Sequence, residues 1–359
     1  MGKVFMKGSE AIAESAVRSG CRFFAGYPIT PQNEIPEYFA RRMPEVGGTF
    51  IQGESEVASV NMVYGAGASG TRAMTSSAST GISLKSEGIS FCASARVPMV
   101  YCNMSRGGPG IGSIQPSQQD YLQATKASGN GGFRMIVFAP ATVQEAADMA
   151  YQAFDLAERD RNPVLILGDG VLATIMEPVE LPPMRTDEEV KALKEKNRSW
   201  ALVGHDPAEG RSFICPGYWS TAMQEQVCIN NEKMYKSWDK DIQVETIGLE
   251  DAQVVVSAFG TSGRIARSAV EILRKEGLKV GMIRPKTISP FPYSTYENLD
   301  YSRVKGILEV EMAIPALMIE DVQLGVKDRC PIETYLRAGG EIVSRTEIIH
   351  RVRGMLERM

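Results

Sequence analysis

Short apolar runs alternate with helical patterns through the first half of the chain, and this alternation most constrains the fold. Strands are predicted at 21–25, 49–52, 72–76, 97–104, 135–139 and 163–167. Helices are predicted around and between them, at 8–19, 31–42, 54–68, 81–95, 120–128 and 143–159. Strands that alternate with helices build a parallel sheet covered on both faces. The sequence therefore predicts an α/β domain over residues 1–175.

The rest of the chain divides into a stretch of weak periodicity and a second α/β region. Residues 176–247 are rich in proline and predict a connecting region with helices at 187–197 and 221–238. The alternation then returns, with strands at 254–260, 280–284 and 306–311, a helix at 262–277, a proline-rich turn at 284–292 and further elements over 332–357. These elements predict a smaller α/β domain over residues 248–359.

Composition limits the kinds of partner. The chain has 39 Lys+Arg against 43 Asp+Glu, a net charge of −4, so no nucleic-acid partner is expected. No apolar run approaches the roughly 18–20 residues of a membrane span, and no signal peptide is recognised, so we expect a cytoplasmic protein without membrane contact. The 6 cysteines include no C-x-x-C pair. Zinc ribbons and ferredoxin-type clusters therefore have no visible ligand set.

A glycine pattern at residues 65–70, GAGASG, matches the G-x-G-x-x-G signature of dinucleotide sites. Such a site requires a strand before the glycines and a helix after them, so that the pyrophosphate meets a helix N-terminus. Here a predicted helix precedes the glycines and a predicted strand follows. We therefore expect them to let a helix end pack closely on the sheet. A nicotinamide-linked oxidoreductase stays open as an alternative.

The tripeptide Gly168-Asp169-Gly170 resembles the start of the magnesium motif of thiamine diphosphate enzymes, which ends in Asn some 25 residues later. Asn197 stands at a matching distance. The intervening residues contain three prolines and a Glu/Lys-rich run, which suit a compact metal loop poorly. We interpret the tripeptide as a turn and predict no metal site. A self-contained thiamine enzyme that uses Asp169 and Asn197 is the alternative.

A third glycine motif, SRGGPGIG at 105–112, follows the predicted strand 97–104. Ligands bind at the carboxyl ends of parallel strands, and Arg106 stands at such an end. Its guanidinium suits a bidentate contact with a carboxylate. A surface arginine on a turn is the alternative interpretation.

Several segments in order resemble one family, the alpha subunits of the thiamine-diphosphate-dependent 2-oxoacid:ferredoxin oxidoreductases. They are GYPITP at 26–31, ESEVASVNMVYGA at 54–66, MTSSASTGISL at 74–84, RGGP at 106–109 and RPKTISPFP at 284–292. Segments at 6–21, 36–48 and 112–126 resemble the 3-methyl-2-oxobutanoate (2-oxoisovalerate) type most, with the 2-oxoglutarate type as the nearest rival, followed by pyruvate. The resemblance implies a pyrimidine-type thiamine-diphosphate-binding domain followed by a transketolase C-terminal-like domain.

The resemblance also implies roles for three residues. Glu56 matches the carboxyl group that hydrogen-bonds N1′ of the cofactor's aminopyrimidine, which makes it the catalytic and cofactor-binding residue. Thr30 matches a threonine that hydrogen-bonds the substrate, and Arg106 matches the arginine that meets the substrate carboxylate. At the start of a predicted helix, Glu56 would lie near free backbone N–H groups.

The implied reaction is the oxidative decarboxylation of a 2-oxoacid with CoA to acyl-CoA and CO₂, with reduction of ferredoxin. The diphosphate and Mg²⁺ site is expected in a beta subunit, and iron–sulfur clusters in gamma or ferredoxin-like subunits. The family usually has Glu-Met-x-x-Gly-Gln where residues 311–317 read EMAIPAL. This departure keeps a further alternative open, a non-catalytic assembly subunit.

Overall fold

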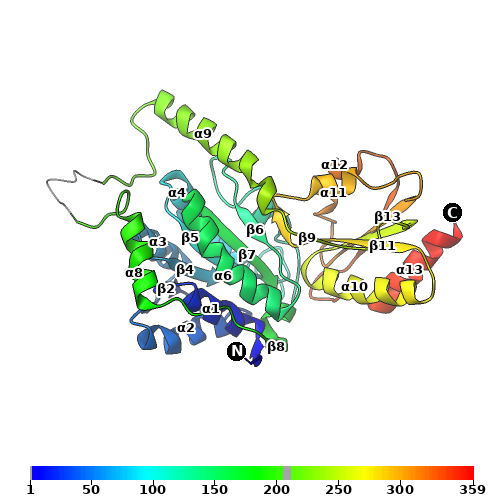
Figure 1. Ribbon diagram of the computed structural model, residues 1–359, viewed down its shortest axis with the longest axis horizontal. Coiled ribbons are helices and arrows are strands. Elements are labelled where there is room, and N and C mark those ends of the chain that lie inside the picture. The colour runs from blue at the N-terminus through cyan, green and yellow to red at the C-terminus, as the bar shows by residue number, and fades with distance from the viewer. Residues whose placement is uncertain (1, 205–211) are drawn as a thin grey trace.

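The computed structural model describes residues 2–204 and 212–359. It has two α/β parts that lie side by side, one around a seven-stranded sheet and one around a five-stranded sheet (Figure 1). A further two-stranded sheet pairs β1 (Val4–Lys7) antiparallel with β8 (Met176–Val179). The sequence patterns did not predict this small sheet, because each of its strands has 4 residues and is partly exposed.

The seven-stranded sheet has the order β12-β6-β7-β5-β4-β2-β3. All neighbouring strands pair in parallel except β12 (Thr287–Ser289), which pairs antiparallel with β6. The parallel strands are β2 (Phe23–Gly26), β3 (Thr49–Gln52), β4 (Ala73–Ser77), β5 (Met99–Ser105), β6 (Ile136–Phe138) and β7 (Pro163–Asp169). Every residue of β4, β5, β6 and β7 is buried, as expected for strands covered on both faces. The predicted parallel α/β fold is confirmed.

Helices cover both faces of this sheet. One face packs against α1 (Gly8–Arg18), α2 (Glu34–Glu45) and α6 (Val143–Asp160). The other packs against α3 (Glu56–Ala68) and α4 (Thr80–Ser94). Two short helices, α5 (Tyr121–Thr125) and α7 (Gly170–Thr174), lie after β5 and β7. The helix predicted at 120–128 is thus shorter than expected, and the one predicted at 31–42 begins three residues later, at Glu34.

The five-stranded sheet has the order β14-β13-β10-β11-β9. Its strands are β9 (Val244–Ile247), β10 (Val254–Ser257), β11 (Val280–Pro285), β13 (Gly306–Glu311) and β14 (Ile332–Leu336). β9 pairs antiparallel with β11, although it falls within the stretch 176–247. One face packs against α10 (Gly260–Lys275) and α13 (Arg345–Glu357). The other packs against α11 (Tyr293–Glu297) and α12 (Ile319–Val326).

The proline-rich segment 284–292, predicted as a turn, contains a strand instead. β12 (Thr287–Ser289) pairs antiparallel with β6 and forms the edge of the seven-stranded sheet. The chain therefore leaves the smaller sheet and adds a strand to the larger one. The prediction was wrong because 3 residues are too few to show a strand period. Prolines also accompany edge strands, where a missing N–H disturbs no ladder.

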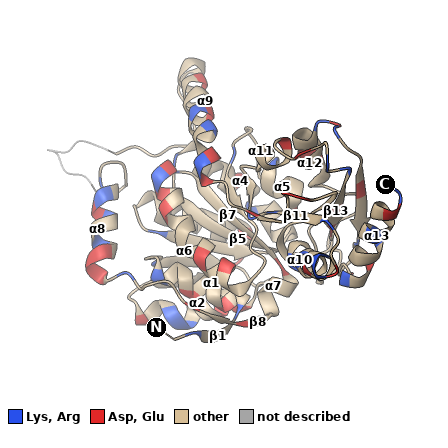
Figure 2. Cartoon of the chain, turned by 45° about the vertical axis from the view of Figure 1, so that its right-hand side comes forward, with Lys and Arg blue, Asp and Glu red and all other residues tan. Residues whose placement is uncertain are grey.

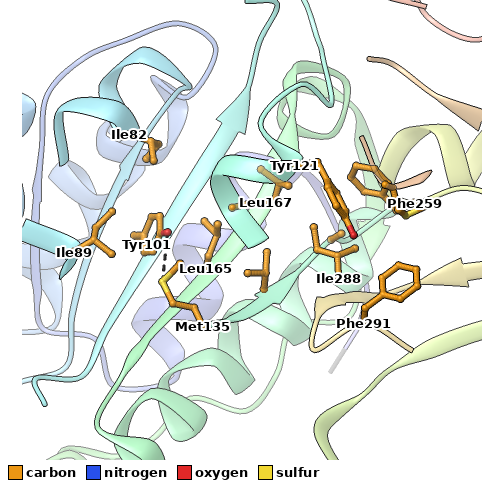
Figure 3. Packing of buried hydrophobic residues seen from close by; sticks show 14 of the residues in the cluster. Ile82, Ile89, Tyr101, Tyr121, Met135, Leu165, Leu167, Phe259, Ile288 and Phe291 are labelled. Carbon is orange, nitrogen blue, oxygen red and sulfur yellow. Dashed lines mark hydrogen bonds between the residues drawn. The ribbon is translucent and has the colours of Figure 1, made fainter. Parts of the chain in front are cut away.

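A shared apolar core joins the two parts of the chain (Figure 3). Tyr121 lies against Phe259 with ring centroids 5.5 Å apart, and Phe291 belongs to the same cluster. Polar contacts accompany this packing: the Gln118 side chain donates to the Phe259 carbonyl at 2.8 Å and accepts from the Met312 N–H at 2.9 Å. The loop after β5 is thus fixed against the smaller sheet.

Two helices occupy the predicted connecting region. α8 (Asp187–Asn197) starts with three acidic residues and has basic residues in its last turn, which complements the helix dipole (Figure 2). α9 (Thr221–Lys236) has no buried residue and extends away from the sheets (Figure 1), and a 3₁₀ turn (Ser237–Asp241) follows it. Among the described helices, none combines the length and apolar character needed to cross a bilayer.

Arg284 forms ion pairs between the two parts of the chain, and replacing it should lower the stability of the fold strongly. Arg284 is almost fully buried and binds Glu145 of α6 at 2.5 and 3.0 Å and Glu245 of β9 at 2.5 Å. We expect Arg284→Met to lower the free energy of unfolding by about 3–5 kcal/mol, because two carboxylates lose their buried counter-ion. Denaturant unfolding at neutral pH measures this loss.

Lowering the pH should diminish the loss of stability caused by Arg284→Met. Burial raises the pKa of Glu145, but the hydrogen bonds and charge of Arg284, with smaller effects of the Ala141 N–H and of Lys286, lower the pKa to about 2. Because the folded pKa is depressed, this stabilisation is present above the unfolded pKa and disappears as pH falls towards 2. The difference between wild type and Arg284→Met should shrink below pH ~4.5. The control is Arg267→Met, which removes a half-exposed partner of Glu245 and should cost under about 1 kcal/mol. Equal losses for both variants would contradict the prediction.

Candidate active site

The carboxyl ends of the parallel strands gather the polar side chains of the candidate site. Thr30 follows β2, Glu56 follows β3, Ser77 ends β4 and Arg106 follows β5. In a parallel sheet these ends lie at one edge, where ligands usually bind. The site therefore arises from the strand order and not from nearness in the sequence.

Glu56 is the first residue of α3. Ser55 caps this helix by accepting a hydrogen bond from the Ala58 N–H at 3.1 Å, which fixes the position of Glu56. The residue is 6% exposed, and within the described chain its carboxylate has neither a hydrogen bond nor an ion pair. Burying an ionised carboxylate without a partner is costly. The Glu56 carboxylate is therefore suited to accept a hydrogen bond from a bound ligand.

Gly81, in the first turn of α4, makes room for this carboxylate. A Cβ atom at position 81 would lie 2.6 Å from Glu56 Oε1 and 2.0 Å from Ser77 Oγ. The Ser77 hydroxyl is buried and has no hydrogen-bond partner in the structure. The glycine thus brings together a carboxylate and a hydroxyl that are both unpartnered.

Ser79 connects the Glu56 region to Arg106. Its φ of 28° is uncommon for a residue with a side chain, and such strain concentrates at functional sites. Three contacts hold it: its N–H donates to Asn103 Oδ1 at 2.9 Å, and its hydroxyl accepts the Arg106 N–H at 2.9 Å and donates to Asp120 at 2.6 Å. Because Gly81 is two residues further on, Glu56 and Arg106 lie on either side of one short loop.

Arg106 is 8% exposed and has no carboxylate partner within the described residues. Its guanidinium donates to the carbonyl oxygens of Thr30 at 3.0 Å and Ile111 at 3.4 Å, and its Nε has no partner among the residues that the structure describes. A buried cation without a counter-ion favours binding of an anion. The same contacts place the backbone of Thr30 beside Arg106, while the Thr30 side chain is exposed.

The sequence predictions missed Lys85, which lies under this site. It belongs to α4, is 0% exposed, and donates to Thr75 Oγ1 at 2.9 Å and to the Glu56 carbonyl at 3.3 Å. Burial lowers its pKa to about 7, against the opposing effect of Glu56. A signal was present in the sequence: Lys85 falls at helical spacing between Ile82 and Ile89, two core positions.

Asp169 and Asn197 lie too far apart to share a metal ion. The Asp169 carboxylate caps α7 by accepting from the N–H groups of Val171 and Leu172 at 2.9 and 3.1 Å, at the carboxyl end of β7. Asn197 donates to the Gly70 carbonyl at 3.2 Å, near the amino end of β4. The 7 residues of β7 place these two ends of the sheet roughly 20 Å apart. The residues that the structure describes contain no cluster of three metal-binding side chains.

The glycines at 65–70 end α3 and precede β4, so the predicted reversed order is confirmed. A Cβ at Gly67 would lie 2.8 Å from Val97 Cγ1 and 2.9 Å from the Pro98 carbonyl oxygen. These glycines therefore serve close packing of a helix end. A helix C-terminus repels a pyrophosphate, which excludes the nicotinamide alternative at this position.

The departure at 311–317 lies at the contact between the two sheets. The buried Glu311 carboxylate accepts the N–H groups of Leu317 and Met318 at 3.0 and 3.1 Å and so fixes the approach to α12. Met312 bonds with Gln118 through its backbone, as described above. Within the chain, this segment therefore holds the loop after β5 in position.

Comparison with known families gives two matches that together cover most of the chain. Residues 14–242 match the thiamine diphosphate-binding region of the pyruvate flavodoxin/ferredoxin oxidoreductases. Residues 252–348 match core domain II of pyruvate:ferredoxin oxidoreductase. The order of the two matches follows the order of the two sheets.

Relatives align along nearly the whole sequence. The ketoisovalerate oxidoreductase subunit VorB of Methanothermobacter thermautotrophicus is 38% identical over 355 residues, which cover 98% of this chain and 98% of the relative. The 2-oxoglutarate synthase subunit KorA of the same organism is 32% identical over 377 residues and 97% of both chains.

Two solved structures share the fold. A 2-oxoglutarate:ferredoxin oxidoreductase from Magnetococcus marinus superposes with a TM-score of 0.83 at 25% identity; the match covers 98% of this chain but only 65% of that one. A split gene transketolase superposes with a TM-score of 0.56 at 12% identity over 98% of both chains, a likeness of fold alone.

Proposed function

The chain belongs to the family of thiamine diphosphate-binding pyruvate flavodoxin/ferredoxin oxidoreductases, and on this premise we propose that it is the alpha-type subunit of a 3-methyl-2-oxobutanoate:ferredoxin oxidoreductase. The complex would oxidatively decarboxylate this branched-chain 2-oxoacid with CoA, giving acyl-CoA and CO₂. The observation that carries the proposal is the 38% identity to a ketoisovalerate oxidoreductase subunit over 98% of both chains, against 32% to the 2-oxoglutarate subunit.

The residues around Glu56 fit thiamine diphosphate, which supplies an electron sink for loss of CO₂ from a 2-oxoacid. Glu56 would hold the aminopyrimidine ring through a hydrogen bond at N1′, because its buried carboxylate has no partner within the described chain. Gly81 keeps the space beside that carboxylate open. The proton shared at N1′ is the one that Glu56 would hold or release during turnover.

Arg106 and Thr30 would bind the substrate. The buried guanidinium of Arg106 has carbonyl partners and a free Nε, so the carboxylate of a 2-oxoacid would supply its missing counter-ion. The exposed Thr30 side chain adjoins it through the bond between Arg106 and the Thr30 carbonyl. Holding the carboxylate would orient the 2-oxo carbon towards the cofactor.

The remaining functions would belong to partner subunits. The wide separation of Asp169 and Asn197 favours a diphosphate and Mg²⁺ site in a beta subunit. The described residues contain no group of three His, Cys, Asp or Glu side chains that could hold a metal ion, so iron–sulfur clusters would belong to gamma or ferredoxin-like subunits, which pass electrons to ferredoxin. We place the complex in the cytoplasm, where 2-oxoacid and CoA are available.

Titration of thiamine diphosphate and Mg²⁺ into the purified chain, alone and with its beta partner, tests the shared site. We expect clear binding in the complex and weak or no binding to the chain alone, since Glu56 contacts only one end of the cofactor. Tight Mg²⁺-dependent binding by the chain alone would contradict this and support a self-contained enzyme. Comparison of kcat/KM for 3-methyl-2-oxobutanoate, 2-oxoglutarate and pyruvate in the reconstituted complex tests the substrate, and preference for 2-oxoglutarate or pyruvate would overturn the assignment.

A further inference from the structure

The proposed reaction gives no role to Lys85, which is a buried cation. Its ammonium group has three donors, and the structure supplies two acceptors, Thr75 Oγ1 and the Glu56 carbonyl. Both acceptors are uncharged, and within the described chain no carboxylate forms an ion pair with it. Burial of an ammonium on neutral partners is costly, and a methionine would fill the same space. A stability role alone therefore does not account for this lysine.

The position of Lys85 relates it directly to Glu56. Residues 81 and 85 are one turn apart on α4 and face the start of α3. Gly81 meets the Glu56 carboxylate, and Lys85 meets the Glu56 backbone carbonyl. One face of α4 therefore contacts both ends of the same glutamate.

We propose that Lys85 is a positioning residue that holds the first turn of α3 through the Glu56 carbonyl and places a positive charge near the Glu56 carboxylate, which keeps this carboxylate oriented for the cofactor's pyrimidine ring. This inference rests on the proposed role of Glu56 at the cofactor's pyrimidine ring. Lys85 itself would touch neither substrate nor cofactor. It acts through Glu56, across a region from which water is excluded and where charges interact strongly.

The proposal predicts a particular dependence on pH. Burial lowers the pKa of Lys85 to about 7, and Glu56 is the one charged group among the described residues that acts on it; its other neighbour, Thr75 of β4, does not titrate. The positive charge of Lys85 is therefore present below pH ~7 and lost above it. Replacing Lys85 should therefore affect kcat/KM and cofactor binding most in mildly acidic solution.

The test compares wild type, Lys85→Met and Lys85→Gln in the reconstituted complex. We expect Lys85→Met to lower kcat/KM and to weaken thiamine diphosphate binding about tenfold at pH 6, with the ratio to wild type approaching one above pH 8. The dissociation constant of the cofactor, measured at both pH values, gives a readout apart from turnover. Lys85→Gln keeps a donor for Thr75 without the charge and should behave as Lys85→Met does.

Each outcome bears on the proposal. If the ratio of Lys85→Met to wild-type kcat/KM is the same at every pH, or if Lys85→Gln restores full activity, Lys85 makes only a structural hydrogen bond. Either result would overturn the proposal. Lys233→Met, which removes a charge from the exposed helix α9, is the matched control and should leave both readouts unchanged. Unaltered activity in Lys85→Met together with loss in Glu56→Gln would sink only this inference, whereas unaltered activity in both would sink the proposed function.

Discussion

Glu56→Gln is expected to lower turnover of the reconstituted complex by about 10²–10⁴-fold, the contribution typical of a positioned acid–base group. The amide has the shape of the carboxyl group but cannot exchange a proton with N1′ of the cofactor. Stability should change little, because the substitution breaks no hydrogen bond or ion pair of the Glu56 carboxylate within the described chain. The measurements are the 2-oxoacid-dependent reduction of ferredoxin and the melting temperature.

The matched control for this variant is Glu54→Gln. Glu54 is two residues away and exposed, and among the described residues its side chain accepts a hydrogen bond only from Ser55, at 3.2 Å. The Glu54→Gln substitution removes one negative charge near the same helix start, but Glu54 does not contact Gly81. Turnover should therefore stay near the wild-type value. Wild-type turnover in Glu56→Gln would reject the catalytic assignment and favour a non-catalytic assembly subunit.

Gly81→Ala is expected to reduce kcat/KM by about 100-fold and to weaken cofactor binding, with little loss of stability. The new Cβ would lie 2.0 Å from Ser77 Oγ and 2.6 Å from Glu56 Oε1, so these atoms must move. Both are near the ends of side chains, and they can rotate without moving the sheet. The protein should fold while the Glu56 carboxylate points elsewhere. Cofactor titration and thermal unfolding of the same sample separate the two effects.

Gly65→Ala provides the comparison. It also replaces a glycine within a helix, but no atom lies within 4 Å of its added Cβ. Alanine is the better helix former, so this variant should gain about 0.5–1 kcal/mol and keep its activity. If Gly81→Ala binds the cofactor as tightly as Gly65→Ala does, the Glu56 carboxylate does not hold the pyrimidine ring.

Much of the larger sheet was predictable because its signals are local. The apolar run from Val100 to Met104 indicates a strand covered on both faces, and every residue of β5 is indeed buried. The pattern of α6 keeps the helical period over 18 residues. β12 was not predictable, because three residues between prolines carry no period and its partner β6 is about 150 residues away.

The candidate site was predicted only in part. Glu56 and Arg106 were identified by the motifs that contain them, and the structure brings both to one edge of the sheet. Lys85 was missed because a lysine in a helix is usually exposed, and its burial follows from how α4 packs on α3 and β4. The spacing of Asp169 and Asn197 in the sequence is compatible with a shared metal site. Spacing does not show which end of the sheet each residue occupies, so the sequence could not exclude the pairing.

The layered α/β fold and the family could be predicted from periodicity and motifs, because these are properties of neighbouring residues. Which of those residues meet depends on the tertiary structure. The contact of Gly81 with Glu56 and the separation of Asp169 from Asn197 both depend on strand order and helix packing. These arise from close packing between segments far apart in the chain, which no local pattern records.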